Sequence, residues 1–269
     1  MGRVIAVANQ KGGVGKTTTA INVATALALD GHRVLLVDLD PQGSASTGIG
    51  VRPQPDDGTV YDLLVGHATA ADVRRQTAVA GLDLIPATRD LVGADVELVN
   101  LPRREHRMHE ALAHVRSQHD FILIDCPPSL SLLTVNGLRA ADGVLIPLQC
   151  EYYALEGLTA LLDTISRVRE TLNPGLAIDG LLLTMYDGRN TLARQVEQEV
   201  RAHFGDQVFR SVIPRNVRVS ESPSHGMPVL LYDPASRGAT AYRAVARELA
   251  SPASQAEEQA EGPGAVRSE

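Results

Sequence analysis

The most constraining feature of this sequence is a glycine-rich segment at residues 9–18, NQKGGVGKTT. A short apolar run at residues 3–8 precedes it, and residues 17–30 follow with good helix formers that end before Gly31. Glycines allow positive φ angles, so the backbone N–H groups can converge on an anion, and the following helix adds its N-terminal dipole. The order of strand, glycine loop and helix predicts a phosphate-binding loop in an α/β fold.

Two lysines lie in this loop, and each needs an explanation. Lys16 is expected to reach the β- and γ-phosphates of a nucleotide, and the Thr17 hydroxyl to ligate Mg²⁺. A compact ammonium suits this crowded position better than a planar guanidinium, and Lys11 and Lys16 are the chain's two lysines against 23 arginines. An ordinary glycine-rich turn is the alternative, which the combination with Lys and Thr disfavours. The other loop residues expected to contact the nucleotide are Gly12, Gly13, Val14, Gly15 and Thr18.

The rest of the chain alternates between predicted strands and helices. Continuous apolar runs, typical of strands covered on both faces, lie at residues 33–40, 82–87, 121–126, 143–149, 177–185 and 207–213. Helical patterns lie at residues 104–118, 156–172, 191–204 and 239–250. Because this alternation produces right-handed βαβ units, we predict a doubly wound α/β fold, a mostly parallel sheet with helices on both faces.

The predicted domain organisation is simple. We expect a single domain over residues 1–250 and a disordered acidic tail over 251–269, where four Glu face one Arg and apolar periodicity is lacking. No apolar run approaches the ~20 residues of a membrane span, and the N-terminus lacks a signal-peptide pattern. Cys126 and Cys150 have no disulfide or metal-site spacing, so we expect both to be buried, reduced thiols in a cytoplasmic protein.

Acidic residues follow two of the predicted strands. Asp125 ends the run FILID, the position from which a carboxylate holds Mg²⁺ directly or through water. Asp38 and Asp40, in VDLDPQG, are two residues apart and therefore lie on the same side of an extended chain. A turn signal at a strand end is the alternative for this pair, and the neighbouring phosphate loop weakens it.

The loop departs from the usual G-x-x-x-x-G-K-[ST] pattern, because Gln10 occupies the first glycine position and Lys11 follows it. Here the sequence resembles the deviant Walker A P-loop NTPases, and within them the ParA/Soj chromosome-partitioning ATPases. The resemblance extends from about residue 3 to residue 249. It is carried by NQKGGVGKTTTAINVA, RVLLVDLDPQG, IPAT, LVGADVEL, FILIDCPPSL, VLIPLQCEYYALEGL, IPRNVRVSESPSHGMPV and YDPASRGATAY.

This resemblance implies an ATPase that uses ATP and Mg²⁺ and forms a homodimer when ATP is bound. Lys11 would reach across the dimer interface to phosphate bound by the partner subunit, so that Lys11, Lys16 and Asp40 form the catalytic set. Asp38 would support the metal shell and Asp40 would orient the attacking water. Because an aspartate polarises water only weakly, hydrolysis without a partner is expected to be slow.

The resemblance also assigns residues outside the loop. Pro214, Arg215 and Asn216, in the segment IPRN, are expected to pack on the adenine. Arg189 and Arg218 are the expected contacts to double-stranded DNA, bound without sequence preference, which would make the protein nucleoid-associated. Net charge by itself argues against DNA binding, since it is −7, but residues 181–250 carry nine Arg against seven acidic residues. A ParB-like centromere-binding protein is the implied partner that stimulates hydrolysis.

Two other classes of protein with a similar loop remain as alternatives to a ParA/Soj ATPase. A MinD-like positioning ATPase would act at a membrane through a basic amphipathic helix, whereas the tail here is acidic and contains proline. A ligase or reductase subunit with the same loop would need a second substrate domain or cluster-binding cysteines. We therefore expect no membrane partner.

Overall fold

The computed structural model describes residues 2–151 and 154–251, and the predicted tail lies outside them apart from Ser251. The described strands form one sheet in the order β3-β4-β2-β5-β1-β6-β7, parallel throughout except for the β3–β4 pair. The strands are β1 (Arg3–Val7), β2 (Val34–Asp38), β3 (Arg75–Gln76), β4 (Leu82–Ile85), β5 (Phe121–Asp125), β6 (Gly143–Gln149) and β7 (Ala177–Thr184). The predicted doubly wound α/β fold is therefore confirmed.

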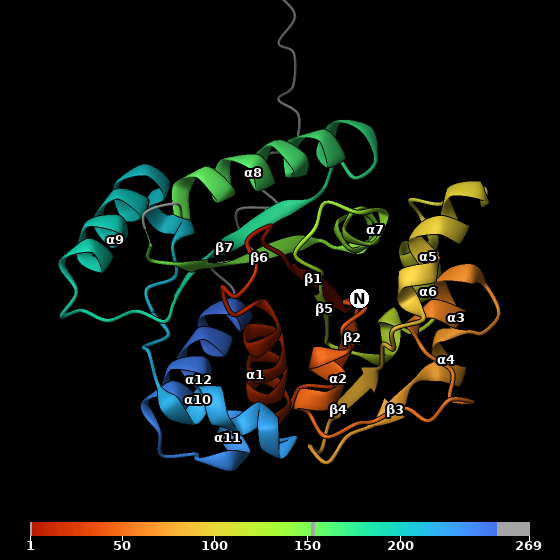
Figure 1. The fold of residues 1–269 in the computed structure, drawn as a ribbon, viewed down its shortest axis with the longest axis horizontal. Coiled ribbons are helices and arrows are strands. Elements are labelled where there is room, and N and C mark those ends of the chain that lie inside the picture. Colours follow the sequence, from red (N-terminus) through yellow and green to blue (C-terminus); the bar gives the residue numbers. More distant parts are fainter. Residues whose placement is uncertain (1, 152–153, 252–269) are drawn as a thin grey trace, which may run out of the picture.

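Helices cover both faces of the sheet, as Figure 1 shows. One face packs against α1 (Lys16–Leu29), α2 (Ser44–Gly48), α10 (Val217–Glu221), α11 (Val229–Tyr232) and α12 (Arg237–Ala250). The other packs against α3 (Val60–Val65), α4 (Ala70–Val73), α5 (Leu91–Glu97), α6 (Arg107–Ala113), α7 (Leu132–Ala140), α8 (Ala154–Thr171) and α9 (Thr191–Phe204). Strands β2 and β5 are buried at every residue, which explains why their sequences lack polar–apolar alternation.

The arrangement of the strands determines where a ligand can bind. Strand β1 lies between β5 and β6, and the chain moves from β1 toward β2 on one side and later toward β7 on the other. In open α/β sheets this reversal leaves a crevice beyond the carboxyl ends of the strands. The glycine loop leaves β1 at this point and leads into α1.

The predicted strand at residues 207–213 is wrong. This segment makes only a single bridge, Leu181 with Val208, and shares two further backbone hydrogen bonds with β7. The reason is a side chain from α12. The Glu248 carboxylate accepts the backbone N–H groups of Arg210 and Ser211, both at 2.9 Å, which removes these donors from any sheet ladder.

The predicted helix at residues 104–118 is also too long. Residues 107–113 form α6, after which the backbone changes to i→i−3 pairing and forms a 3₁₀ turn (Arg116–Gln118). Helices α2 to α5, α7, α10 and α11 and strand β3 were not predicted. Most of them are shorter than two turns, and α7 has a glycine in its interior, so neither length nor periodicity marks them.

Candidate nucleotide and metal site

The glycine loop forms a cradle of backbone N–H groups at the start of α1. Gly13 and Gly15 have φ angles of 77° and 89°, in the left-handed region that favours glycine. Gly15 is the N-cap of α1, and no side chain caps the first turn. A Cβ at Gly12 or Gly13 would meet no atom within 4 Å, so the backbone is open to a ligand. The helix dipole and the uncapped N–H groups together suit a phosphate.

Neighbouring strands hold the loop in place. The Asn9 side chain donates to the carbonyl of Pro147 at 2.7 Å, at the end of β6. The Thr184 hydroxyl, at the end of β7, donates to the carbonyl of Val14 at 2.8 Å. Both are buried hydrogen bonds, so the loop is preorganised before a ligand arrives.

The two lysines point in different directions. Lys16 is buried, with 6% of its surface exposed, and its ammonium donates to the backbone carbonyl of Lys11 at 2.9 Å. Burial lowers the pKa of Lys16, while the charges of Asp125 and Asp40 oppose that shift. The Lys11 ammonium instead forms an ion pair with the Glu151 carboxylate at 2.8 Å, and these side chains are 34% and 48% exposed.

Two carboxylates meet at the ends of adjacent strands. Asp38 and Asp125 are direct partners in the β2–β5 register, and both are fully buried. Burial raises the pKa of Asp38 to about 6, although one of its oxygens accepts the N–H and the hydroxyl of Ser46 at 2.8 and 2.7 Å. Burial, and then the charge of Asp38, raise the pKa of Asp125 well above its ordinary value.

Asp125 is a buried carboxylate that is suited to bind a cation. Neither of its buried oxygens has a hydrogen-bond partner in standard geometry, although the Thr17 hydroxyl is near enough to lower its pKa. An unpaired buried carboxylate is costly, and a divalent cation would remove that cost. The described residues contain no group of three or more His, Cys, Asp or Glu side chains able to hold a metal alone. Asp125, Asp38 and Thr17 therefore fit Mg²⁺, which binds through few protein ligands together with water and phosphate.

Asp40 lies two residues beyond the end of β2. It is 9% exposed, and one of its oxygens accepts the backbone N–H of Gln42 at 2.9 Å. Its charge acts on both Lys16 and Asp125, so the structure brings Asp40 close to the phosphate loop and the metal carboxylates.

The segment expected to contact the base lies beside β7. Pro214 forms an isolated bridge with Tyr186, and the N–H of Arg215 donates to the Tyr186 carbonyl at 3.0 Å. The side-chain oxygen of Asn216 caps α10 by accepting the N–H of Val219 at 3.3 Å. Tyr186 follows Met185, whose terminal methyl would lie 3.8 Å from a Cβ at Gly15. The segment therefore adjoins the phosphate loop.

The two arginines expected to contact DNA are exposed, and both have acidic partners. Arg189 precedes α9 and pairs with Asp187 at 2.9 Å, with 92% of its side chain exposed. Arg218 lies on α10, pairs with Glu221 at 3.0 Å and Asp233 at 3.3 Å, and is 53% exposed. The predicted burial of Cys126 and Cys150 as free thiols is confirmed.

Sequence reasoning missed the residues that position the predicted ones. Ser46 binds Asp38, Thr184 fixes the loop, and Glu151 pairs with Lys11. Each lies far along the chain from its partner or on a short element, so no motif spacing identifies it. Over residues 2–151 and 154–251, no helix has the length and apolar character that a membrane span requires.

Comparison with known proteins decides the family. A family profile described as an AAA domain matches residues 2–178. The chain is 57% identical to chromosome partitioning protein ParA of Caulobacter vibrioides over 251 residues, 93% of this chain and 94% of that protein. It is 55% identical to the sporulation initiation inhibitor protein Soj of Bacillus subtilis, over 93% and 99% of the two chains. This chain belongs to the ParA/Soj family of chromosome-partitioning ATPases.

Solved structures with a similar fold contain a nucleotide and magnesium. Cobyrinic acid a,c-diamide synthase of Mycobacterium smegmatis, solved with ADP and magnesium, superposes with a TM-score of 0.80 at 41% identity over 91% of this chain and 93% of that one. The MinD protein of Pyrococcus horikoshii, solved with Mg-ADP, has a TM-score of 0.77 at 28% identity over 94% and 98% of the two chains. The Mycobacterium smegmatis protein has also been solved with a bound ATP analog and magnesium, and ATP with Mg²⁺ is the ligand pair that the site described above fits.

Proposed function

We propose that this ParA/Soj-type ATPase is a nucleotide-switched dimer that binds DNA without sequence preference and is released when a ParB-like partner stimulates hydrolysis. The single observation that carries the proposal is the divergence of the two loop lysines. Lys16 folds over its own loop, where it can serve phosphate bound by its own subunit. The Lys11 ammonium instead donates to the Glu151 carboxylate.

The ion pair of Lys11 is easily exchanged for another. Half-exposed pairs contribute only about 0–1 kcal/mol, because water screens them and two side chains must be ordered. A γ-phosphate presented by a second subunit offers more negative charge in a drier setting, where a charged hydrogen bond is stronger. ATP, which carries that phosphate, would then favour the dimer, and ADP would not.

Hydrolysis is assigned to residues around the loop. Mg²⁺, when bound, would neutralise charge on the β- and γ-phosphates. Lys16 would bind the transferred phosphoryl group. The Asp40 carboxylate, fixed at one oxygen by the Gln42 N–H, would orient water with the other. Since aspartate is a weak base, turnover without a partner is slow in this scheme.

DNA binding is assigned to Arg189 and Arg218, which are exposed and can approach phosphates. Their present partners are surface carboxylates, and exposed pairs of this kind are weak. Two arginines per subunit give a dimer about four phosphate contacts, so the logarithm of affinity should fall with that of salt at a slope of about −3.6. The protein would be cytoplasmic and associated with the nucleoid.

One experiment tests the scheme. DNA binding is measured by fluorescence anisotropy with ATP, ADP or no nucleotide, each with and without a ParB-like protein. We expect tight binding with ATP alone and loss of that binding as the partner accelerates turnover. Equal binding in all three nucleotide conditions would refute the switch. Co-sedimentation with anionic liposomes in ATP, in place of DNA binding, would favour the MinD-like alternative.

A further inference from the structure

Helix α5 carries an apolar stripe that faces solvent. Val92, Val96 and Val99 are 61%, 71% and 52% exposed, and their i, i+4, i+7 spacing places them in one row along α5 and the 3₁₀ turn that follows it (Leu98–Asn100). Leu91, Ala94 and Leu98 on the opposite side are buried, so the stripe is not needed for packing. Single exposed valines are ordinary, but a row of three along a helix and the turn that continues it is an apolar surface that a partner can cover.

An acidic cleft adjoins this stripe. Its volume is about 910 Å³, and Gly93 and Glu97 of α5 form one wall. Five carboxylates line the cleft against one guanidinium, that of Arg89. The carboxylates belong to Asp56, Asp57, Asp62, Asp90 and Glu97. A partner that covers both surfaces must therefore present apolar side chains together with cationic ones.

The connection between α5 and the metal carboxylates is short. Ala87 lies in the loop that joins β4 to α5, and its N–H donates to the Ser46 hydroxyl oxygen at 3.1 Å. That hydroxyl in turn donates to Asp38. The Ala87 carbonyl would lie only 2.9 Å from a Cβ at Gly43, and the Gly43 N–H donates to the Asp40 carbonyl at 2.9 Å. Movement of this loop therefore reaches both Asp38 and Asp40.

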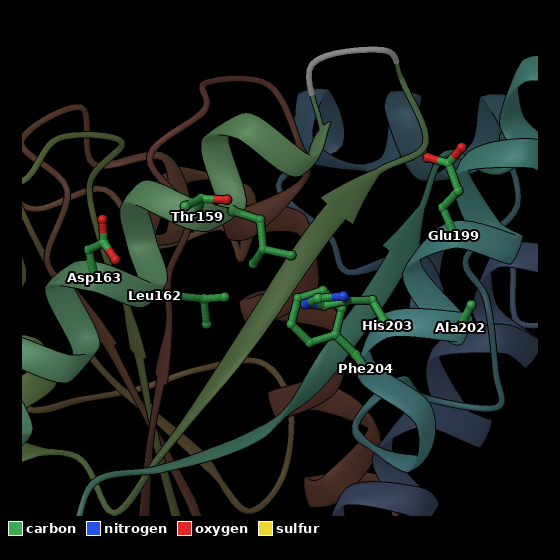
Figure 2. A pocket seen from close by; sticks show the side chains of 8 residues that line it. Thr159, Leu162, Asp163, Glu199, Ala202, His203 and Phe204 are labelled. Carbon is green, nitrogen blue, oxygen red and sulfur yellow. The ribbon is translucent and has the colours of Figure 1, made fainter.

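A second hollow lies between α8 and α9. Leu162 and Phe204 form its floor, and Asp163 and Glu199 stand on opposite walls (Figure 2). Its volume is about 670 Å³, and the residues that line it belong to α8 and α9 alone. Figure 1 shows α5 on the opposite side of the molecule from α9. This hollow also has an apolar floor and two carboxylates, so it provides a matched control.

We infer that the α5 stripe and its acidic cleft form the docking surface for a cationic, amphipathic segment of the partner that stimulates hydrolysis, and that Ser46 transmits docking to Asp38. The inference rests on the proposed function, because it assumes that such a partner exists. It assigns two roles. The valines and the cleft carboxylates bind the partner, and Ser46 is a positioning residue that couples this surface to the metal carboxylate.

The first test separates docking from catalysis. ATP turnover is measured with saturating DNA while the purified, full-length ParB-like protein is titrated. For Val92→Ser/Val96→Ser we expect the partner concentration for half-maximal stimulation to rise about tenfold or more. Basal turnover and ATP-dependent DNA binding should stay within about twofold of wild type, since both residues are exposed. Leu29→Ser, at another exposed apolar position (45%), should leave stimulation unchanged.

Charge is tested in the same assay. Asp56→Asn/Glu97→Gln should weaken stimulation by the partner. The difference from wild type should become smaller as the salt concentration is raised, because salt screens the charges. Asp163→Asn/Glu199→Gln removes the same charge from the hollow between α8 and α9 and should behave as wild type. If the valine variant is stimulated like wild type while wild type responds to the partner, the docking surface is wrong. If wild type shows no stimulation at all, the proposed function fails and this inference falls with it.

The role of Ser46 needs a measurement that a purely structural effect would not change. For Ser46→Ala, partner binding by biolayer interferometry should match wild type, whereas the ratio of stimulated to basal turnover should fall. Ser46→Thr keeps the hydroxyl and should restore that ratio. If Ser46→Ala lowers basal and stimulated turnover by the same factor, Ser46 does not transmit docking.

Discussion

Replacement of Lys11 by alanine tests the proposed switch most directly. In the single subunit the change removes one half-exposed ion pair with Glu151, which contributes about 0–1 kcal/mol to the free energy of unfolding. Across a desolvated interface, loss of a charged partner of phosphate costs about 2–5 kcal/mol, which corresponds to a roughly 30- to 5,000-fold weaker dimer. The same substitution should therefore hardly affect the fold and strongly affect assembly.

Analytical ultracentrifugation in ATP and Mg²⁺ measures this dimer, and fluorescence titration with a labelled ATP analogue measures nucleotide affinity. For Lys11→Ala we expect nucleotide affinity close to that of wild type, while the dimer and its DNA binding are lost. Lys16→Ala should instead lose tight nucleotide binding, because Lys16 is buried over its own loop.

Glu151→Gln supplies the matched control for Lys11→Ala. It breaks the same ion pair but leaves the lysine in place, so the ATP dimer should persist or strengthen by up to about fivefold. If Lys11→Ala still dimerises on ATP as wild type does, Lys11 has no role across the interface. If Glu151→Gln loses the dimer as Lys11→Ala does, the pair within one subunit, and not the contact to a partner's phosphate, supports assembly.

Three other outcomes follow from the site. Asp40→Ala should leave an ATP dimer that stays on DNA, and brisk phosphate release by this variant would remove Asp40 from its role. The double variant Arg189→Ala/Arg218→Ala should flatten the salt dependence of DNA binding by a slope of about 3.6, and an unchanged slope would exclude both arginines. Because burial raises the pKa of Asp38 to about 6, its charge destabilises the metal-free fold at neutral pH and no longer does so below about pH 4. Urea unfolding in EDTA measures the free energy of unfolding of Asp38→Asn relative to wild type. It should be higher by up to about 3 kcal/mol near pH 7.5 and by about a third of that near pH 4.5. An equal increase at both pH values would contradict a buried charge at Asp38.

The parts of the site that could be predicted from the sequence are those determined by local backbone chemistry. The glycine loop needs positive φ angles at Gly13 and Gly15, and its strand and helix are adjacent in the chain, so a short motif contains the whole cradle. Asp38 and Asp125 end strands that are buried at every residue, and carboxyl ends of parallel strands meet at one edge. Their proximity follows from topology alone.

The parts that could not be predicted depend on contacts between distant segments. The apolar run at residues 207–213 has strand-like composition, but the Glu248 carboxylate from the last helix accepts two of its N–H groups. Ser46 is one of two serines that closely follow Asp40, and only the fold shows that it lies between Asp38 and Ala87. The composition and hydrophobic periodicity of a segment indicate whether it can be buried. They do not show which side chain from a distant part of the chain will hydrogen-bond to its backbone.

The pairing of strands that are distant in the sequence also brings like charges together at this site. Two carboxylates meet in register without solvent, burial raises the pKa of each, and the nearby ammonium of Lys16 is itself disfavoured by burial. A core built for stability alone would replace such groups by apolar ones. Phosphate and a divalent cation would balance these charges, so the buried groups that cost stability are the same groups that the proposed ligands would contact. Because the Asp38 carboxylate is hydrogen-bonded through Ser46 to Ala87, a change of charge at Asp38 would act on the loop that leads to α5.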